Sequence, residues 1–162
     1  MASPLELCMC VATVTGMHFA AVDSTYKLLR AERLVVNNGV GVRGTRVSAK
    51  DAAALLTALC GVVHVADSAA AVRRFAKTGF VKALADLIEN PTDDGIEVHA
   101  EKVIARIGDT IFGKGQSLKA ALLADSVQSK SPIEDLGDMS FVRGVSCKTI
   151  RAISELLNAQ AT

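Results

Sequence analysis

Residues 3–35 are SPLELCMCVATVTGMHFAAVDSTYKLLRAERLV, and they decide the predicted fold. The Ser3–Glu6 segment begins a helix, because a serine cap, a proline at the first helical position and a glutamate three residues after the cap form a capping box. Gly16 supplies the left-handed residue that ends a helix. A second helix is predicted over about 20–33, so a short turn separates two helices.

The predicted second helix has one apolar and one polar face. Residues spaced by three and four form a buried stripe of Val22, Tyr26 and Leu29. The opposite face holds the charged and hydroxyl side chains Asp23, Ser24, Lys27 and Arg30. We therefore expect one side of this helix to pack on the protein and the other to face outward.

A glycine-rich stretch over 34–47 follows, and Asn38-Gly39 within it is the strongest short hairpin signal. Ser48 then caps a third helix, with Asp51 near the positive end of that helix. This helix, to about residue 62, is apolar on nearly every side, which predicts a central core helix. Helix, turn, helix, glycine-rich hairpin and helix is the element order of a winged helix-turn-helix.

The rest of the chain alternates short predicted helices with loops. The helices are expected over 69–77, 80–88, 117–126 and 148–158, and a strand over 139–145. The loop at 90–95 is the best candidate for a boundary between two lobes. Residues 96–112 fit either a helical stripe or a hairpin that turns at Gly108-Asp109, and the hairpin is slightly favoured.

The predicted fold class is mainly α with minor β. It is an N-terminal winged helix-turn-helix packed on a helical C-terminal part, with a possible small hairpin. Residues 1–65 form the predicted DNA-binding unit, and residues 66–162 the helical support and oligomerisation region. Half of the residues are hydrophobic and only 4% are aromatic, so alanine, valine and leucine must fill a mostly helical core.

Two segments, Val11–Met17 and Val22–Val35, resemble the pattern A-x-x-T-G-x followed by V-x-x-x-x-x-x-L-x-x-x-G-L-V of MarR-, IclR- and MerR-like winged-helix regulators. The resemblance covers under a third of the chain, and Arg33 stands where these families usually have glycine. It implies that the second helix reads duplex DNA. Residues 44–56 and 145–157 also resemble segments of phage- or prophage-derived bacterial proteins, which implies a mobile-element origin.

The candidate DNA-binding residues follow from how a helix fits a groove. Small or polar side chains at the N-terminal end of a groove-bound helix reach base edges, and basic side chains meet phosphates. Arginines among the glycines of a wing can reach the backbone or enter the minor groove. The predicted DNA-binding residues are His18, Ala21, Ser24, Thr25, Lys27, Arg30, Arg43 and Arg46.

The net charge of +1 is unevenly distributed. Residues 1–50 hold six basic and three acidic side chains, whereas the remainder holds twelve basic and fourteen acidic ones. The positive charge is therefore concentrated in the part of the chain that carries the DNA-binding pattern.

No spacing of residues indicates a catalytic or metal site. The four cysteines show no zinc or disulfide framework, and the three histidines are scattered. We therefore expect no enzyme activity, no cofactor and no metal. No apolar run reaches the ~18 residues needed to cross a bilayer, and no basic region precedes the apolar stretch 5–14, so a cytoplasmic protein without a membrane partner is expected.

The sequence thus predicts a sequence-selective double-stranded DNA-binding protein, a transcriptional regulator that forms a homo-oligomer, with a dimer favoured. A dimer would place two reading helices about one duplex turn, ~34 Å, apart. Two alternatives stay open: a small DNA-packaging, terminase-like subunit, and a helical adaptor that binds a protein partner and no DNA. A protein partner such as RNA polymerase is compatible with a regulator.

Overall fold

The computed structural model describes residues 2–36, 46–62, 64–100, 103–113 and 142–159. These residues form a mainly helical protein with a small antiparallel sheet, as the sequence predicts. The helices are α1 (Pro4–Thr15), α2 (Phe19–Ala31), α3 (Ala49–Cys60), α4 (Ser68–Ala76), α5 (Phe80–Glu89) and α7 (Cys147–Asn158), with a 3-10 turn, η1, at Val65–Asp67. The strands are β1 (Ile96–His99), β2 (Ile104–Ile107), β3 (Thr110–Phe112) and β4 (Val142–Val145). None of the described helices is long and apolar enough to span a membrane.

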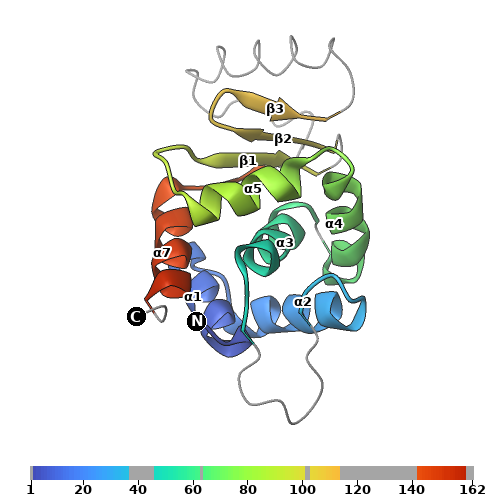
Figure 1. Cartoon of the computed structure of the whole chain (residues 1–162). Helices are drawn as coiled ribbons and strands as arrows, with labels where there is room; N and C mark the ends of the chain where they lie inside the picture. The colour runs from blue at the N-terminus through green and yellow to red at the C-terminus, as the bar shows by residue number, and fades with distance from the viewer. Residues whose placement is uncertain (1, 37–45, 63, 101–102, 114–141, 160–162) are drawn as a thin grey trace, which may run out of the picture.

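Helix α3 is the centre of the molecule, and α2, α4, α5 and α7 pack around it (Figure 1). Every residue of α3 is buried except Lys50. Its many alanines allow neighbouring helices to approach closely. Helix α1 packs against both α2 and α7, so it joins the second helix to the last one. The prediction of a central core helix after Ser48 is confirmed.

The four strands form one antiparallel sheet in the order β3-β2-β1-β4. The hairpin interpretation of residues 96–112 is confirmed, because β2 and β3 pair across a turn at Gly108-Asp109. The strand predicted within 139–145 is confirmed as β4, which pairs with β1. Figure 1 shows the sheet on the side of α5 that faces away from α3, so α5 lies between the central helix and the sheet.

One hydrophobic core runs through the helices and the sheet. It includes Leu29 and Leu55 from the first 65 residues and Phe80 and Ile150 from the rest of the chain. The ring of Phe80 also meets that of Phe112 edge-on, with 5.7 Å between the ring centroids. The two predicted units therefore share a core, and their division into a DNA-binding and a supporting unit stays a prediction about function.

The helices begin where the predicted caps place them. Ser3 accepts the Glu6 N–H on its hydroxyl and donates its own N–H to the Glu6 carboxylate, so the predicted capping box is confirmed. Ser48 and Asp51 make the same reciprocal contacts at the start of α3. Gly16 follows α1 in the left-handed conformation, with φ 70°.

Part of the predicted wing lies outside the described residues. The part of the wing outside the described residues is 37–45, which contains Asn38-Gly39 and Arg43. The helix predicted over 117–126 also lies outside the described residues. The described flanks of the wing, 34–36 and 46–48, contain no strand.

Arg33 ends α2 in a backbone conformation that favours glycine. Its φ is 57°, and two hydrogen bonds close the helix: Leu34 N–H to the Leu29 carbonyl at 2.9 Å and Arg33 N–H to the Arg30 carbonyl at 3.1 Å. This pair of bonds defines a Schellman motif, in which the left-handed position is usually glycine. The backbone therefore makes the tight turn even though the side chain is an arginine.

We expect Arg33→Gly to raise the free energy of unfolding by about 0.5–1 kcal/mol, because glycine adopts positive φ without a Cβ clash. The greater freedom of glycine in the unfolded chain limits the gain. Urea titration of the variant and the wild type measures the difference. A variant less stable than the wild type would show that the Arg33 side chain contributes more to stability than its backbone strain costs.

Candidate nucleic-acid interface

Helix α2 presents two different faces. Val22, Tyr26 and Leu29 are buried, which confirms the predicted stripe. The exposed residues of the helix after its first residue are Ala20, Ser24, Lys27 and Ala31. Figure 1 shows α2 at the edge of the group of helices, beside the short turn that follows α1. The polar side of α2 therefore lies at the protein surface.

The structure places most of the predicted DNA-binding residues on or near this face. The exposed ones on α2 and at its cap are His18, Ser24 and Lys27. Arg46 is also exposed, but it precedes α3, beside Val47, whose N–H donates to the Ala2 carbonyl at 3.0 Å. Ala21 and Arg30 are half-buried on α2. Arg43 lies outside the described residues.

The prediction is wrong for Thr25. Its side chain is 1% exposed, and its hydroxyl donates to the Ala21 carbonyl at 2.9 Å. Thr25 lies three residues after Val22 and four before Leu29, and residues at these spacings share a helix face. Thr25 therefore belongs to the buried stripe, where its hydroxyl is satisfied by the preceding turn and cannot reach a base.

An ion pair lowers the net charge of the exposed face. The Lys27 Nζ lies 2.6 Å from the Asp23 carboxylate, one turn earlier on α2, with the Lys27 side chain 73% exposed. Exposed pairs at this spacing stabilise a helix by only ~0.3–0.5 kcal/mol. Lys27 can therefore exchange the carboxylate for a phosphate at small energetic cost, although the two side chains cancel each other's charge in the free protein.

His18 caps α2 and keeps one edge of its ring exposed. The Nδ1 atom accepts the Ala20 N–H at 3.3 Å. A neutral imidazole that accepts on Nδ1 carries its proton on Nε2. The Nε2–H is therefore the group through which His18 can donate to a ligand.

A buried carboxylate holds both ends of the predicted wing. Asp51 is 4% exposed, and its Oδ1 accepts the Val36 N–H at 2.7 Å. Its Oδ2 accepts the N–H and the hydroxyl of Ser48, each at 2.7 Å. Val36 precedes residues 37–45 and Ser48 follows them, so one side chain closes this segment at its base.

Two exposed cations lie next to α2 and to the segment that follows it, and they were not among the predicted DNA-binding residues. Arg33 follows α2, and Lys50 lies in the first turn of α3. Their closeness in sequence to Arg30 and Arg46 is the signal that could have identified them. Arg73 on α4 has a different role, because it donates to the Glu32 carboxylate at 2.7 Å and ties α4 to the end of α2.

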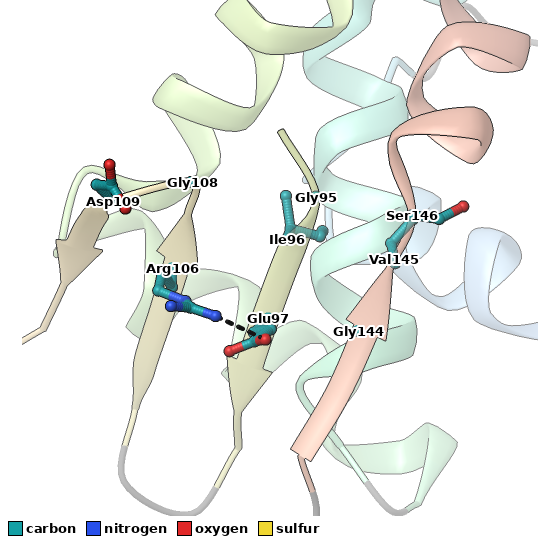
Figure 2. Close-up of a pocket in the computed structure, with 9 residues that line it drawn as sticks. All are labelled: Gly95, Ile96, Glu97, Arg106, Gly108, Asp109, Gly144, Val145 and Ser146. Carbon is teal, nitrogen blue, oxygen red and sulfur yellow. Dashed lines mark hydrogen bonds and ion pairs between the residues drawn. The ribbon is translucent and has the colours of Figure 1, made fainter. Parts of the chain in front are cut away.

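A shallow cavity of about 450 Å³ lies at one end of the sheet (Figure 2). Glu97 on β1 and Arg106 on β2 face each other there and form an ion pair at 2.8 Å. Gly95, Gly108 and Gly144 leave space around this pair because they carry no side chains. The two central charges neutralise each other, and Asp109 also lines the cavity, so its charged residues give no preference for an anion.

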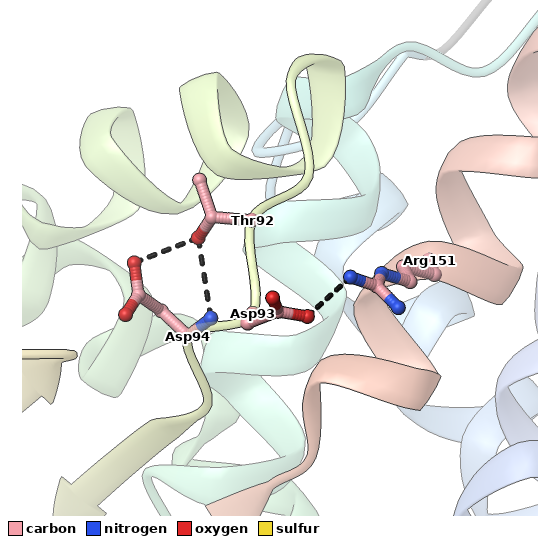
Figure 3. Close-up of polar contacts among 4 residues, drawn as sticks. All are labelled: Thr92, Asp93, Asp94 and Arg151. Atoms are coloured by element: carbon pink, nitrogen blue, oxygen red, sulfur yellow. Dashed lines mark hydrogen bonds and ion pairs between the residues drawn. The ribbon is translucent and has the colours of Figure 1, made fainter.

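The acidic loop before β1 is held by its own polar contacts (Figure 3). The Thr92 hydroxyl donates to the Asp94 carboxylate at 2.7 Å and accepts the Asp94 N–H at 3.2 Å. Asp93 forms an ion pair with Arg151 of α7. Within the described ranges, no three His, Cys, Asp or Glu side chains gather in a way that could hold a metal ion. These acids therefore serve as a structural turn and as a tie to the last helix.

Burial suppresses the ionisation of two cysteines. It raises the pKa of the Cys60 thiol to about 12, an effect that the nearby Arg143 guanidinium opposes. Burial also raises the pKa of the Cys8 thiol to about 11, with a further increase from Asp23 and a decrease from Lys27. Both thiols therefore stay protonated near neutral pH and act as small apolar side chains.

The Cys60 shift predicts a loss of stability in alkali. Because the folded pKa lies above the ordinary value of 9.0, the unfolded chain loses its thiol proton first as the pH rises. The free energy of unfolding that comes from the protonated Cys60 thiol is fully present below about pH 9 and is lost between about pH 9 and pH 12. The loss amounts to about 2 kcal/mol by about pH 10.5. We expect Cys60→Ala to lose stability less steeply than the wild type in urea titrations over this range. Parallel curves would show that Cys60 ionises equally in both states.

Comparisons of the chain with known protein families, with curated proteins and with solved structures give no match. The function must therefore be inferred from the surface itself.

Proposed function

We propose that the chain is a sequence-selective double-stranded DNA-binding protein in which α2 is the reading helix. The observation that carries the proposal is the exposed face of α2. After the exposed Phe19 at the start of α2, Ala20 and Ser24 are small side chains on this face, and Lys27 adds a cation. Helix α1 and the turn at Gly16 precede it, in the manner of a helix-turn-helix. In this proposal residues 34–47 form the wing, and the protein regulates transcription of a phage-like or mobile element.

The exposed face of α2 suits the major groove in both shape and charge. The major groove of B-DNA is about 12 Å wide and admits one helix, and small side chains let the helix axis approach the base edges. Ser24 and the Nε2–H of His18 supply hydrogen-bonding groups on the exposed side. Lys27 and Arg46 are exposed cations that would neutralise phosphates. Base contacts then specify the sequence, and phosphate contacts position the protein.

The test is a titration of the whole chain with a pool of duplex DNA over a range of salt concentrations. Affinity should fall as salt rises, because neutralised phosphates release counterions. Removing two phosphate contacts with Lys27→Ala and Arg46→Ala should make the plot of log affinity against log salt less steep by about 2. The control pair, Lys82→Ala and Lys148→Ala, removes two exposed cations from α5 and α7. Equal effects of the two pairs would contradict the proposed surface.

We propose further that the protein is a dimer joined through α1, and not through residues 66–162, which the sequence predicted as the oligomerisation region. Leu5 and Met9 are 58% and 54% exposed, and Phe19 at the start of α2 is 38% exposed. Together with Thr13 they line a shallow apolar groove without a charged residue. Leu5, Met9 and Thr13 repeat every four residues, so they form one stripe along α1. An antiparallel α1 from a second copy would pair Leu5 with Thr13 across a twofold axis near Met9 without bringing like charges together.

Met9→Glu should weaken the dimer at least tenfold, because the substitution places two carboxylates together at the centre of the interface. Analytical ultracentrifugation over a range of protein concentrations measures the change. Val65→Glu is the matched control, since Val65 is 41% exposed and lies outside the stripe. A wild type that stays monomeric at high concentration would remove the dimer from the proposal.

The apolar stripe also favours a second candidate function, an adaptor that binds a protein partner and no DNA. Exposed apolar patches mark protein interaction sites, and the five large hydrophobic residues exposed in the described part of the chain all precede residue 66. Monomeric behaviour without duplex binding at low salt would favour the adaptor. A ring-sized oligomer that binds duplex DNA would instead favour the packaging subunit.

A further inference from the structure

A second cavity, of about 390 Å³, lies between the end of α1, the end of α3 and strand β4. Thr15 and Met17, on either side of Gly16, line it from the turn before α2. Leu56, Leu59 and Val145 supply apolar walls that are themselves almost completely buried. Its volume falls at the small end of the range for ligand-binding cavities, about 300–1,000 Å³.

Of the described residues that line this cavity, Arg143 alone is charged. Its Nη1 donates to the Leu59 carbonyl at the end of α3, at 2.6 Å, which fixes the orientation of the guanidinium. A guanidinium carries five N–H donors, and this contact uses one of them. Within the described ranges no carboxylate forms an ion pair with Arg143. The cavity therefore combines apolar walls with a positioned cation that has no counter-charge among the described residues.

The remaining polar groups of the cavity are already engaged or neutral. The Thr15 hydroxyl donates to the Val11 carbonyl at 2.6 Å and accepts the Met17 N–H. The Cys60 thiol stays protonated near neutral pH because burial raises its pKa. Neither group would compete with a ligand for the guanidinium, and neither adds a charge.

From this arrangement we propose that the cavity binds a small aliphatic monocarboxylate. The carboxylate pairs with the free N–H groups of Arg143, and the hydrocarbon chain lies against Leu56, Leu59 and Val145. Guanidinium and carboxylate suit each other because both are planar and can form two parallel hydrogen bonds. The bound molecule would also contact Met17, in the segment that leads into α2. The binding itself does not depend on whether α2 binds DNA.

The test is a titration of the full ¹⁵N-labelled chain with hexanoate, followed by amide NMR, beside 1-hexanol and hexylamine of the same chain length. Hexanoate should shift the amides of Met17, Leu59 and Gly144 in a saturable way. Its affinity should be at least fivefold above that of hexanol, and hexylamine should not bind. Absence of saturable shifts at these amides, or equal affinity for hexanol, would overturn the proposal.

Variants then assign the site. Arg143→Gln should weaken hexanoate binding at least tenfold, whereas Arg106→Gln, a matched change on the neighbouring part of the sheet, should leave it unchanged. Because Arg143→Gln also removes the contact with Leu59, two further variants keep the test decisive: Arg143→Lys, which retains a cation and should keep part of the affinity, and Met17→Trp, which fills the cavity and should abolish binding. Wild-type affinity in Arg143→Gln or Met17→Trp would contradict the site.

Discussion

Replacing Asp51 with alanine should lower the free energy of unfolding by about 3 kcal/mol. The carboxylate accepts three hydrogen bonds, from the Val36 N–H, the Ser48 N–H and the Ser48 hydroxyl. It is buried, so water cannot fully replace it, and the donors would be left without a partner. For a chain of this size the loss corresponds to a fall in melting temperature of roughly 10 °C.

Asp51→Asn removes the charge and one hydrogen-bond acceptor but keeps the shape of the side chain. The amide nitrogen cannot accept a hydrogen bond, so one side of the contact with Val36 or Ser48 is lost while the volume is kept. We expect a cost of about 2 kcal/mol in urea titration. Asp86→Asn, an exposed change on α5, should stay within about 0.5 kcal/mol of the wild type. An Asp51→Asn variant as stable as the Asp86 control would contradict the role assigned to Asp51.

Ser24→Glu should weaken duplex binding about 30-fold or more, which corresponds to about 2 kcal/mol. Ser24 is exposed at the middle of α2, so the new carboxylate would face the negatively charged groove. The helix should persist, because glutamate has a higher helix propensity than serine. Asp23→Asn should do the opposite and strengthen binding a few-fold, since it releases Lys27 from the ion pair at 2.6 Å.

The paired design distinguishes charge at the interface from a change in the net charge of the protein. Lys82→Glu, at an exposed position on α5, changes the net charge more than Ser24→Glu does. It should nevertheless weaken DNA binding much less than Ser24→Glu. Fluorescence anisotropy at fixed salt measures all three variants. Equal weakening by Ser24→Glu and Lys82→Glu would show that only the net charge matters and that α2 is not the contact surface.

Local signals in the sequence were sufficient to predict most of the helices. Ser3 and Ser48 each mark a helix start by a short-range pattern, and Gly16 marks an end, so these positions follow from neighbouring residues alone. The glycine-aspartate turn at Gly108-Asp109 is equally local, which is why the hairpin could be favoured over a helix. All four features are confirmed.

Long-range contacts could not be predicted in this way. Asp51 and Val36 are fifteen residues apart, and nothing in the sequence around either residue indicates that one carboxylate would bind both Val36 and Ser48. The pairing of β4 with β1 and the approach of Arg143 to Leu59 likewise depend on the tertiary fold. The cavity beside Arg143 was therefore not foreseen.

The candidate interface was predicted in part. Helix periodicity placed Ser24 and Lys27 correctly on the exposed face of α2, and the same periodicity applied to Thr25 would have assigned it to the buried stripe with Val22 and Leu29. The ion pair between Lys27 and Asp23 follows from their spacing of four residues, which the assignment of Lys27 to phosphate did not take into account.

The role of α2 as the reading helix is tested most sharply by an amide NMR map of the protein on addition of a duplex pool at low salt. If the exposed side of α2 meets the groove, the largest shifts should fall at His18, Ala20, Ala21, Ser24 and Lys27, with α5 and the sheet almost unchanged. Spectra that stay the same, or that change along Leu5–Thr13 and not on α2, would contradict the claim.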